Sequence, residues 1–315
     1  MNQDYTRITV REIFDEQGSN MRMRLLAGEA GLGRFIDHPR IQKPSLAFAG
    51  FLNLSDYRMQ VIGRTELDYL ATRSEAEQKQ AVDAVFDLRL ACVVITRDQT
   101  PPNVILEAAE RTDTPIFSST LSSAEFMTDM TIYLTHRLAP RVYQHGVYVD
   151  VFGLGVLLTG ASGIGKSEIA LELIGRGHRL IADDMVELAR ESPDVLVGRS
   201  PETLRYHIEI RGLGILNIRD LFGAAALTDA KRVGLVVEVI PWQEMDDYDR
   251  LLVEERSTRI NDVQLPKVVL PVRPGRSLAV LVEVATRNQL LKMRGIDSGK
   301  AFVEALHQRI EKGQK

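Results

Sequence analysis

The residues best suited to chemistry lie between Gly160 and Asp184, in the segment GASGIGKSEIALELIGRGHRLIADD. Its start matches G-x-x-x-x-G-K-[ST], a pattern in which backbone N–H groups and a lysine cradle phosphates. We expect Lys166 to reach the β- and γ-phosphates of a nucleotide, and the Ser167 hydroxyl to assist a magnesium ion. The predicted phosphate-binding loop consists of Gly160, Ala161, Ser162, Gly163, Ile164, Gly165, Lys166 and Ser167.

Two carboxylates, Asp183 and Asp184, follow this loop early in the chain. The pattern predicts a helix from Lys166 to about Gly175 and a strand over residues 178–182 that returns beside the loop strand. In such a parallel connection the second strand ends at the same edge as the loop. Neighbouring side chains of a strand point to opposite faces, so we predict unequal roles for the two aspartates. A solvated Asp-Asp turn is the alternative that this geometry disfavours.

Three further polar residues could join the site. If residues 146–160 form a hairpin that turns near residue 153, antiparallel pairing places His145 opposite about position 161, although a structural histidine is the alternative. Glu209 and Arg211 lie on one face of a predicted strand. They could hold a metal ion and a phosphate, or form an ion pair with each other.

Two later segments are charged and turn-prone. PWQEMDDYDRLLVEER, residues 241–256, holds the single tryptophan and is typical of a mobile, exposed loop. In residues 265–277, LPKVVLPVRPGRS, the cations Lys267, Arg273 and Arg276 surround rigid prolines. They could cradle an anionic ligand, or they could belong to a solvated loop.

Two α/β domains are predicted to carry these residues. From Thr9 to about Arg137, short β-rich runs alternate with helical ones, without any motif that has a mechanism. Pro140 interrupts a helical pattern in RLAPRVYQHG, which we interpret as a linker. The boundary near residue 138 gives a small N-terminal α/β domain, 1–138, and a C-terminal catalytic domain, 139–315. A last helix is expected to begin with Ser298 as its N-cap.

The composition is that of an ordinary globular chain, with 315 residues of which 44% are apolar. A net charge of −4 gives no electrostatic reason to expect nucleic acid as a partner. No stretch resembles a membrane span or a signal peptide, so we expect a cytoplasmic protein. The single cysteine, Cys92, lies in the apolar run ACVVIT, which favours a buried thiol over a nucleophile and excludes a disulfide scaffold.

Five segments together resemble one family. GASGIGKS, GHRLIADD, EIRGLGILNI, YDRL and PVRPGR occur in the order and spacing of the bacterial HPr kinase/phosphorylase family, and the resemblance spans both domains. It implies an ATP-dependent kinase for a serine of the phosphocarrier protein HPr, which regulates carbon metabolism linked to the phosphotransferase system. It also implies the reverse reaction, in which inorganic phosphate attacks phosphoserine and pyrophosphate is released. A homohexamer and a catalytic domain similar to phosphoenolpyruvate carboxykinase are further implications.

The resemblance also implies roles for individual residues. Asp183 would be the general base that takes the serine proton, and the acid of the reverse reaction, with His145 and Asp184 as close partners. Ser167 and Glu209 would assist Mg²⁺, while Arg211 and Arg250 would contact phosphate or substrate. Ser277 departs from the asparagine expected after PVRPGR. The loop needed for dephosphorylation would run from Lys267 to Arg276, with Lys267, Val268, Val269, Leu270, Pro271 and Val272 as its core.

Two other functions stay open. One is a small-molecule kinase or carboxykinase-like enzyme that uses the same loop and aspartate; the segments EIRGLGILNI and PVRPGR argue against it through resemblance alone. The other is a nucleotide-dependent switch that binds ATP without transferring phosphate. Asp183 beside the loop disfavours the switch, because a switch needs no proton acceptor for a hydroxyl.

Overall fold

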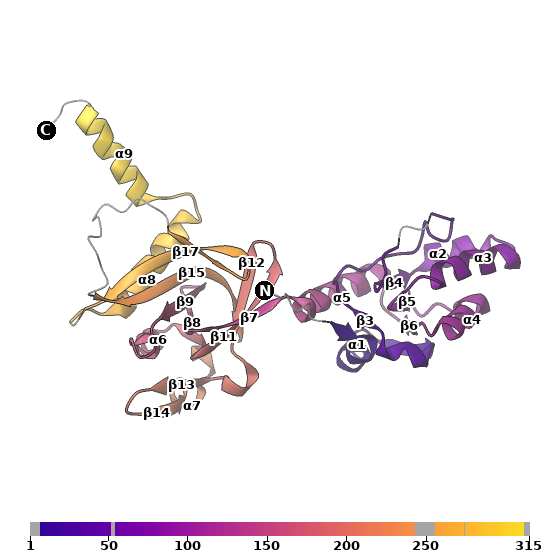
Figure 1. Ribbon diagram of the computed structural model, residues 1–315, viewed down its shortest axis with the longest axis horizontal. Helices are drawn as coiled ribbons and strands as arrows, with labels where there is room; N and C mark the ends of the chain where they lie inside the picture. The colour runs from indigo at the N-terminus through magenta and orange to yellow at the C-terminus, as the bar shows by residue number, and fades with distance from the viewer. Residues whose placement is uncertain (1–6, 52–53, 243–255, 274, 312–315) are drawn as a thin grey trace. The chain divides into compact units, whose positions relative to one another are not determined.

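The computed structural model describes residues 7–51, 54–242, 256–273 and 275–311. The chain forms two compact units, Met1–Pro140 and Arg141–Lys315, and each contains both helices and strands (Figure 1). The predicted α/β fold class is therefore confirmed. Among the described residues, the helices are all too short or too polar to cross a membrane.

The N-terminal unit is built on a four-stranded sheet in which three strands run parallel. Its order is β2 (Met23–Ala27), β6 (Ile116–Ser119), β5 (Cys92–Thr96) and β4 (Met59–Ile62), with β2 antiparallel to β6. A separate pair joins β1 (Ile8–Thr9) to β3 (Phe35–Ile36). The helices are α1 (Val10–Gln17), α2 (Arg64–Ala71), α3 (Glu75–Phe86), α4 (Asn103–Thr112) and α5 (Ser123–Leu138).

Local sequence explains where several of these helices begin. Ser74 and Ser122 each accept a hydrogen bond from a backbone N–H three residues on, and the glutamate there bonds back to the serine N–H. Such a capping box satisfies two N–H groups that a helix start leaves unpaired. On β5, Cys92 is fully buried, and this burial raises the pKa of its thiol to about 12. The cysteine is a core residue, as predicted.

The C-terminal unit is dominated by a strongly curled sheet of nine strands within the described residues. Their order is β10-β8-β9-β15-β12-β11-β7, with β17 beside β15 and β16 beside β17. The bounds are β7 (Arg141–His145), β8 (Val147–Val151), β9 (Leu154–Gly160), β10 (Arg179–Ala182), β11 (Met185–Ser192), β12 (Val195–Arg199), β15 (Ala230–Pro241), β16 (Ser257–Ile260) and β17 (Val263–Val272).

Helices and a small hairpin cover one face of this sheet. Buried apolar residues of α6 (Lys166–Gly175) and α8 (Leu278–Lys292) share one core cluster with β8, β9 and β15. The hairpin of β13 (His207–Ile210) and β14 (Gly214–Asn217) adds Ile208 and Ile210 to this cluster, followed by the short α7 (Ile218–Phe222). The last helix is α9 (Ser298–Glu311).

The strand directions bring several strand ends to one edge. β9, β15 and β17 run parallel to one another. β10 runs in the same direction, because β10 and β9 are both antiparallel to β8. The carboxyl ends of all four strands therefore reach the edge at which the phosphate loop follows β9. Ligands of α/β sheets commonly bind at such an edge.

Four local predictions need correction. β10 pairs with β8, not with the loop strand β9, since β8, the first strand of the hairpin, lies between them. Residues 141–145 of the predicted linker form the sheet strand β7. Residues 267–272, predicted as a loop, are strand β17, held by β15. At α9, Asp297 and not Ser298 accepts a hydrogen bond from the Lys300 N–H.

Candidate active site

A pocket of about 420 Å³ opens where the phosphate loop meets the ends of the neighbouring elements. It gathers residues from β7, the loop, α6, the end of β10, and β13. The predicted site residues that line it are His145, Gly160, Ser162, Gly163, Gly165, Lys166, Ser167, Asp183, Asp184, Glu209 and Arg211. Gly146, Val147 and Glu168 also line it and were not singled out in the sequence. Glu168 follows Ser167 directly, so its position in the first helical turn was the available signal.

The loop backbone requires glycine at two positions. Gly160 has a φ of 139°, and a Cβ there would collide with the Val239 carbonyl oxygen on β15. Gly163 has a φ of 77°, and a Cβ there would collide with the Arg211 guanidinium. Both values lie where side chains are disfavoured. The glycines therefore allow the loop to bend tightly and Arg211 to lie directly against it.

Lys166 is the first residue of α6, and its ammonium lies over the loop. Its Nζ donates to the carbonyl oxygens of Gly160 and Ala161, each at 3.0 Å. The N-terminal end of a helix carries partial positive charge and free N–H groups, so an anion is favoured here. Lysine, helix end and Arg211 together make this part of the pocket suitable for phosphate groups.

Asp183 lies at the floor of the pocket and is only 4% exposed. Its Oδ1 accepts a hydrogen bond from Ser167 Oγ at 2.9 Å, and its Oδ2 accepts one from the Glu209 N–H at 2.9 Å. Burial raises the pKa of this carboxyl above its ordinary value, and these hydrogen bonds partly offset the effect. A carboxyl group that holds a proton more readily than usual suits acid–base catalysis.

Asp184 occupies a different environment from its neighbour. Its backbone is left-handed, with a φ of 65°, and its side chain is 68% exposed. The Oδ1 atom lies 3.5 Å from His145 Nδ1, and its carbonyl oxygen lies 3.3 Å from the same nitrogen. The turn thus separates the two carboxylates into a buried and an exposed one, which agrees with the predicted inequality.

His145 lies beside the pocket through a strand pairing that differs from the predicted one. It is the last residue of β7, which pairs with β11, and its register partner is Met185. The predicted pairing across the β8–β9 hairpin is therefore wrong, because Gly146 ends the pairing before β8 begins. The predicted position beside the phosphate loop is nevertheless observed, because β11 starts directly after the aspartate pair.

Glu209 of β13 and Arg211 both line the pocket, although Arg211 follows the strand and does not belong to it as predicted. Arg211 contacts the loop at Gly163. Within the described residues, no group of three or more His, Cys, Asp or Glu side chains is arranged to hold a metal ion. Magnesium sites in kinases rely on one or two carboxylates together with substrate phosphates and water. The hydroxyl of Ser167 and the carboxylates beside it provide oxygen ligands that fit this kind of site.

One predicted residue falls outside the described part of the chain, and the predicted dephosphorylation residues do not line the pocket. Arg250 falls outside the described residues. Lys267 lies within β17, where its Nζ is 2.7 Å from Glu238 Oε2, and residues 267–272 are not part of the pocket lining. Arg273, just after β17, places its guanidinium 4.9 Å from the centre of the Trp242 ring, which follows β15. These two side chains lie at the sheet edge shared with the phosphate loop.

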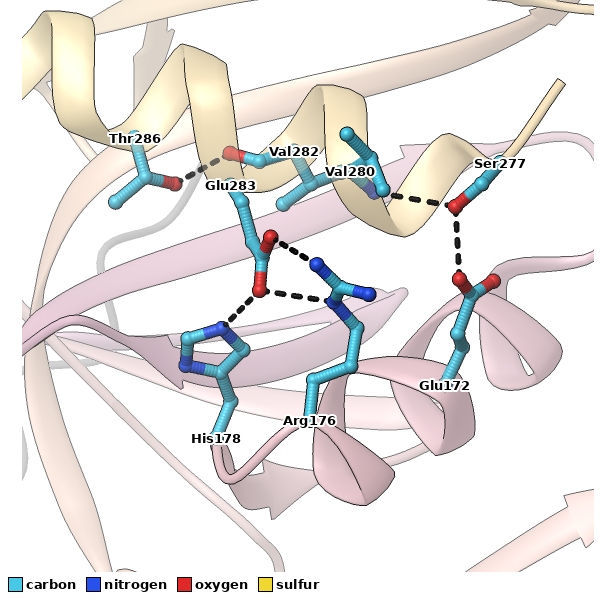
Figure 2. A network of polar contacts seen from close by, with 8 residues as sticks. All are labelled: Glu172, Arg176, His178, Ser277, Val280, Val282, Glu283 and Thr286. Carbon is cyan, nitrogen blue, oxygen red and sulfur yellow. Dashed lines mark hydrogen bonds and ion pairs between the residues drawn. The ribbon is translucent and has the colours of Figure 1, made fainter.

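The opposite end of α6 holds a second buried carboxylate, which the sequence did not reveal. Glu283 of α8 accepts hydrogen bonds from Arg176 at 2.7 and 3.0 Å, and His178 Nε2 lies 2.9 Å from its Oε1 (Figure 2). The bonds from Arg176, followed by that from His178, lower the pKa of Glu283 to about 2. His178 is thus a structural residue.

Ser277 connects α6 to the start of α8. Its Oγ donates to Glu172 Oε1 at 2.7 Å and accepts from the Val280 N–H at 3.3 Å (Figure 2). Serine and asparagine are both strong helix N-caps. The departure from the expected asparagine therefore retains the cap of α8, and the serine hydroxyl also donates to Glu172.

Comparison with known proteins gives a consistent result. A family model for the HPr serine kinase N terminus matches residues 8–134, and one for the HPr serine kinase C-terminal domain matches residues 136–306. The chain is 41% identical to an HPr kinase/phosphorylase of Geobacter sulfurreducens over 305 residues, 96% of each chain. It is 41% identical to one of Bacillus cereus over 93% of this chain and 96% of the relative. A solved Hpr(Ser) kinase/phosphatase from Coxiella burnetii is 36% identical, covers 51% of this chain and 98% of its own, and gives a TM-score of 0.47.

Proposed function

The chain belongs to the HPr serine kinase family, and from this premise we propose that it is a bifunctional HPr kinase/phosphorylase. In one direction it transfers the γ-phosphoryl group of ATP to a serine of HPr. In the other it transfers the phosphoryl group of phosphoserine-HPr to inorganic phosphate and forms pyrophosphate. The observation that carries this proposal is Asp183, a buried carboxyl with a raised pKa beside Ser167 of the phosphate loop.

In the forward direction Asp183 acts as the general base. It takes the proton of the HPr serine hydroxyl as the serine oxygen bonds to the γ-phosphorus and the bond to the leaving ADP oxygen breaks. Lys166, Arg211 and the N-terminal end of α6 stabilise the charge on the phosphoryl oxygens. The hydrogen bonds from Ser167 and the Glu209 N–H hold the carboxylate in place.

In the reverse direction the same carboxyl acts as the acid. A phosphate oxygen bonds to the phosphorus of phosphoserine, the bond to the serine oxygen breaks, and Asp183 returns its proton to that oxygen. Because the attacking phosphate occupies the place of the ATP β-phosphate, the product is pyrophosphate. A raised pKa suits this double role, since the group must be available in both protonation states.

Mg²⁺ is proposed as the cofactor, held by the Ser167 hydroxyl and Glu209 together with the substrate phosphates. It would supply positive charge that neutralises the phosphoryl oxygens. His145 and Asp184 are proposed to adjust the electrostatic environment of Asp183 from the exposed side, because both line its pocket.

Several finer features belong to the same proposal. We infer a cytoplasmic homohexamer whose catalytic domain spans residues 139–315 and follows an N-terminal domain of residues 1–138. Arg250 is proposed to contact substrate, and residues 267–276 to serve the dephosphorylation. Arg273 and Trp242 support the last assignment, since both follow strands that end at the edge of the phosphate loop. The similarity of the catalytic domain to phosphoenolpyruvate carboxykinase stays a prediction.

One two-stage assay tests the proposed function. The protein is incubated with ATP, Mg²⁺ and HPr, ATP is then removed, and inorganic phosphate is added. We expect phosphoserine on HPr in the first stage and pyrophosphate in the second, measured by mass spectrometry and a coupled pyrophosphate assay. Tight ATP binding without phosphate on HPr would contradict the kinase and favour the nucleotide switch. Transfer to a small molecule in place of HPr would favour the small-molecule kinase.

A further inference from the structure

The β13–β14 hairpin exposes two large apolar side chains next to the pocket. Ile215 is 73% exposed and Leu213 is 68% exposed. We call these two residues the apolar lip. They follow directly on Arg211, which touches the phosphate loop, so the lip and the pocket belong to one short piece of chain.

The register of the hairpin fixes the direction in which Ile215 points. Ile215 lies opposite Glu209, and residues directly opposite each other in an antiparallel pair share a face of the sheet. The other face carries Ile208, which is buried with its partner Leu216 packed on the same core. Glu209 lines the pocket. Ile215 therefore stands beside Glu209, on the face that looks toward the pocket.

Leu213 is held outward by the turn that joins the two strands. Its N–H donates to the Ile210 carbonyl oxygen at 3.0 Å, and the glycines on both sides of it have a φ of 83°. This backbone joins the paired residues Ile210 and Gly214 through three residues and leaves the leucine side chain at the tip. The apolar lip thus belongs to an ordered, hydrogen-bonded turn.

We propose that the apolar lip is the docking surface for apolar side chains that flank the acceptor serine of the protein substrate, an inference that rests on the proposed function. ATP phosphates and inorganic phosphate gain nothing from an isoleucine and a leucine, because they are bound by cations and N–H groups. A protein acceptor must bring its serine to Asp183, and its surface then lies against the rim of the pocket. Burial of the lip by that surface provides apolar contact area which a small acceptor cannot supply.

The test compares Ile215→Thr with wild type in steady-state phosphorylation of HPr. Threonine keeps the β-branched shape that strands favour, so the hairpin is retained. We expect the KM for HPr to rise about tenfold, because one buried aliphatic side chain is lost from the contact. The kcat and the KM for ATP are expected to stay unchanged. Ile215→Leu is expected to restore most of the affinity for HPr.

Ile132→Thr is the matched control, since Ile132 is 54% exposed, lies in α5 of the other compact unit and does not line the pocket. An unchanged KM for HPr in Ile215→Thr, with an active wild type, overturns the docking surface and leaves the proposed function standing. A wild type that never phosphorylates HPr overturns both. Sedimentation velocity of each variant completes the test: a smaller assembly in Ile215→Thr would identify the lip as a contact between copies of this chain and overturn the proposal.

Discussion

Two buried carboxylates, Asp183 and Glu283, lie at opposite ends of α6. The pKa of Asp183 is raised above its ordinary value, and the pKa of Glu283 is lowered. Asp183 is bound by a hydroxyl and an N–H near the first turn of the helix, and burial raises the pKa of its carboxyl. Glu283 is bound by Arg176 and His178 just after the last turn, and these two partners, Arg176 first, lower the pKa of its carboxyl to about 2. The kind of partner, and not burial alone, sets the direction.

The difference separates a reactive carboxyl from a structural one. A carboxylate paired with a guanidinium keeps its charge at any physiological pH and fixes two elements together, here α6 and α8 (Figure 2). A carboxyl that is buried and bound only by neutral donors has a raised pKa and holds its proton more readily, which suits catalysis in both directions. Searching for such unequal pairs is a general way to find acid–base residues.

The largest expected effect comes from Asp183→Asn. We expect the rates of both the kinase and the phosphorolysis to fall by roughly 10²–10⁴-fold, because the proton acceptor is lost. The amide can accept from the Glu209 N–H and donate to Ser167 Oγ, so the loop should keep its geometry. ATP affinity, measured by calorimetry, is expected to be unchanged.

Asp184→Asn is the matched control for that substitution, since it removes the exposed charge and keeps the buried one. We expect its loss of rate to be smaller than that of Asp183→Asn. An active Asp183→Asn enzyme together with an inactive Asp184→Asn enzyme would exchange the roles of the two aspartates. Asp183 would then no longer be the reactive carboxyl that is contrasted with Glu283.

The pH dependence of the kinase and of the phosphorolysis tests whether Asp183 serves as base in one direction and as acid in the other. The kinase needs Asp183 as a carboxylate, so its rate should fall about tenfold per pH unit below the raised pKa. The phosphorolysis needs the protonated form, so its rate should fall as pH rises above the same value. Both profiles are measured as kcat/KM for the HPr substrate. Parallel profiles in the two directions would show that no single group serves as both base and acid.

The smallest effect on activity is expected for Glu283→Gln, which should mainly lower stability. Removing the charge weakens the hydrogen bonds to Arg176 and His178, at a cost of about 1–2 kcal/mol in the free energy of unfolding. Thermal denaturation should show a Tm lower by roughly 3–6 °C, and the folded enzyme should keep its kcat.

The stability difference between wild type and Glu283→Gln should itself depend on pH. The pKa of Glu283 is lowered by folding, so its stabilisation is complete above the ordinary value of 4.5 and is lost as pH falls toward about 2. The gap in Tm should therefore close in acid. A gap that stays constant down to pH 3 would mean that shape, and not charge, explains the effect.

Local patterns predicted the helix after the phosphate loop, because they act through neighbouring residues. The helix after the loop was expected from Lys166 to about Gly175 and has those bounds. The inequality of the two aspartates was predicted from strand alternation, but β10 ends at Ala182, and the left-handed turn at Asp184 is what separates them. Strand order was not accessible in this way: nothing in the residues of β10 shows that β8, rather than β9, is its partner.

Contacts between distant segments were missed for the same reason. His178 and Glu283 are separated by 105 residues, and neither lies in a pattern that indicates the other. His145 was placed correctly but by the wrong pairing, since β11, its true partner, was not considered. Burial, which raises the pKa of Asp183, is a property of the whole curled sheet and has no local signature.

The left-handed backbone of Asp184 has a consequence for reading related sequences. With a φ of 65°, this position tolerates Asp, Asn and Gly, while β-branched side chains would be strained there. The backbone conformation alone thus restricts which residue types can occupy position 184, independently of any need for a negative charge there. A relative with Asp-Asn or Asp-Gly at this point could keep the turn and the buried base, whereas one with Asp-Val would have to rebuild the turn.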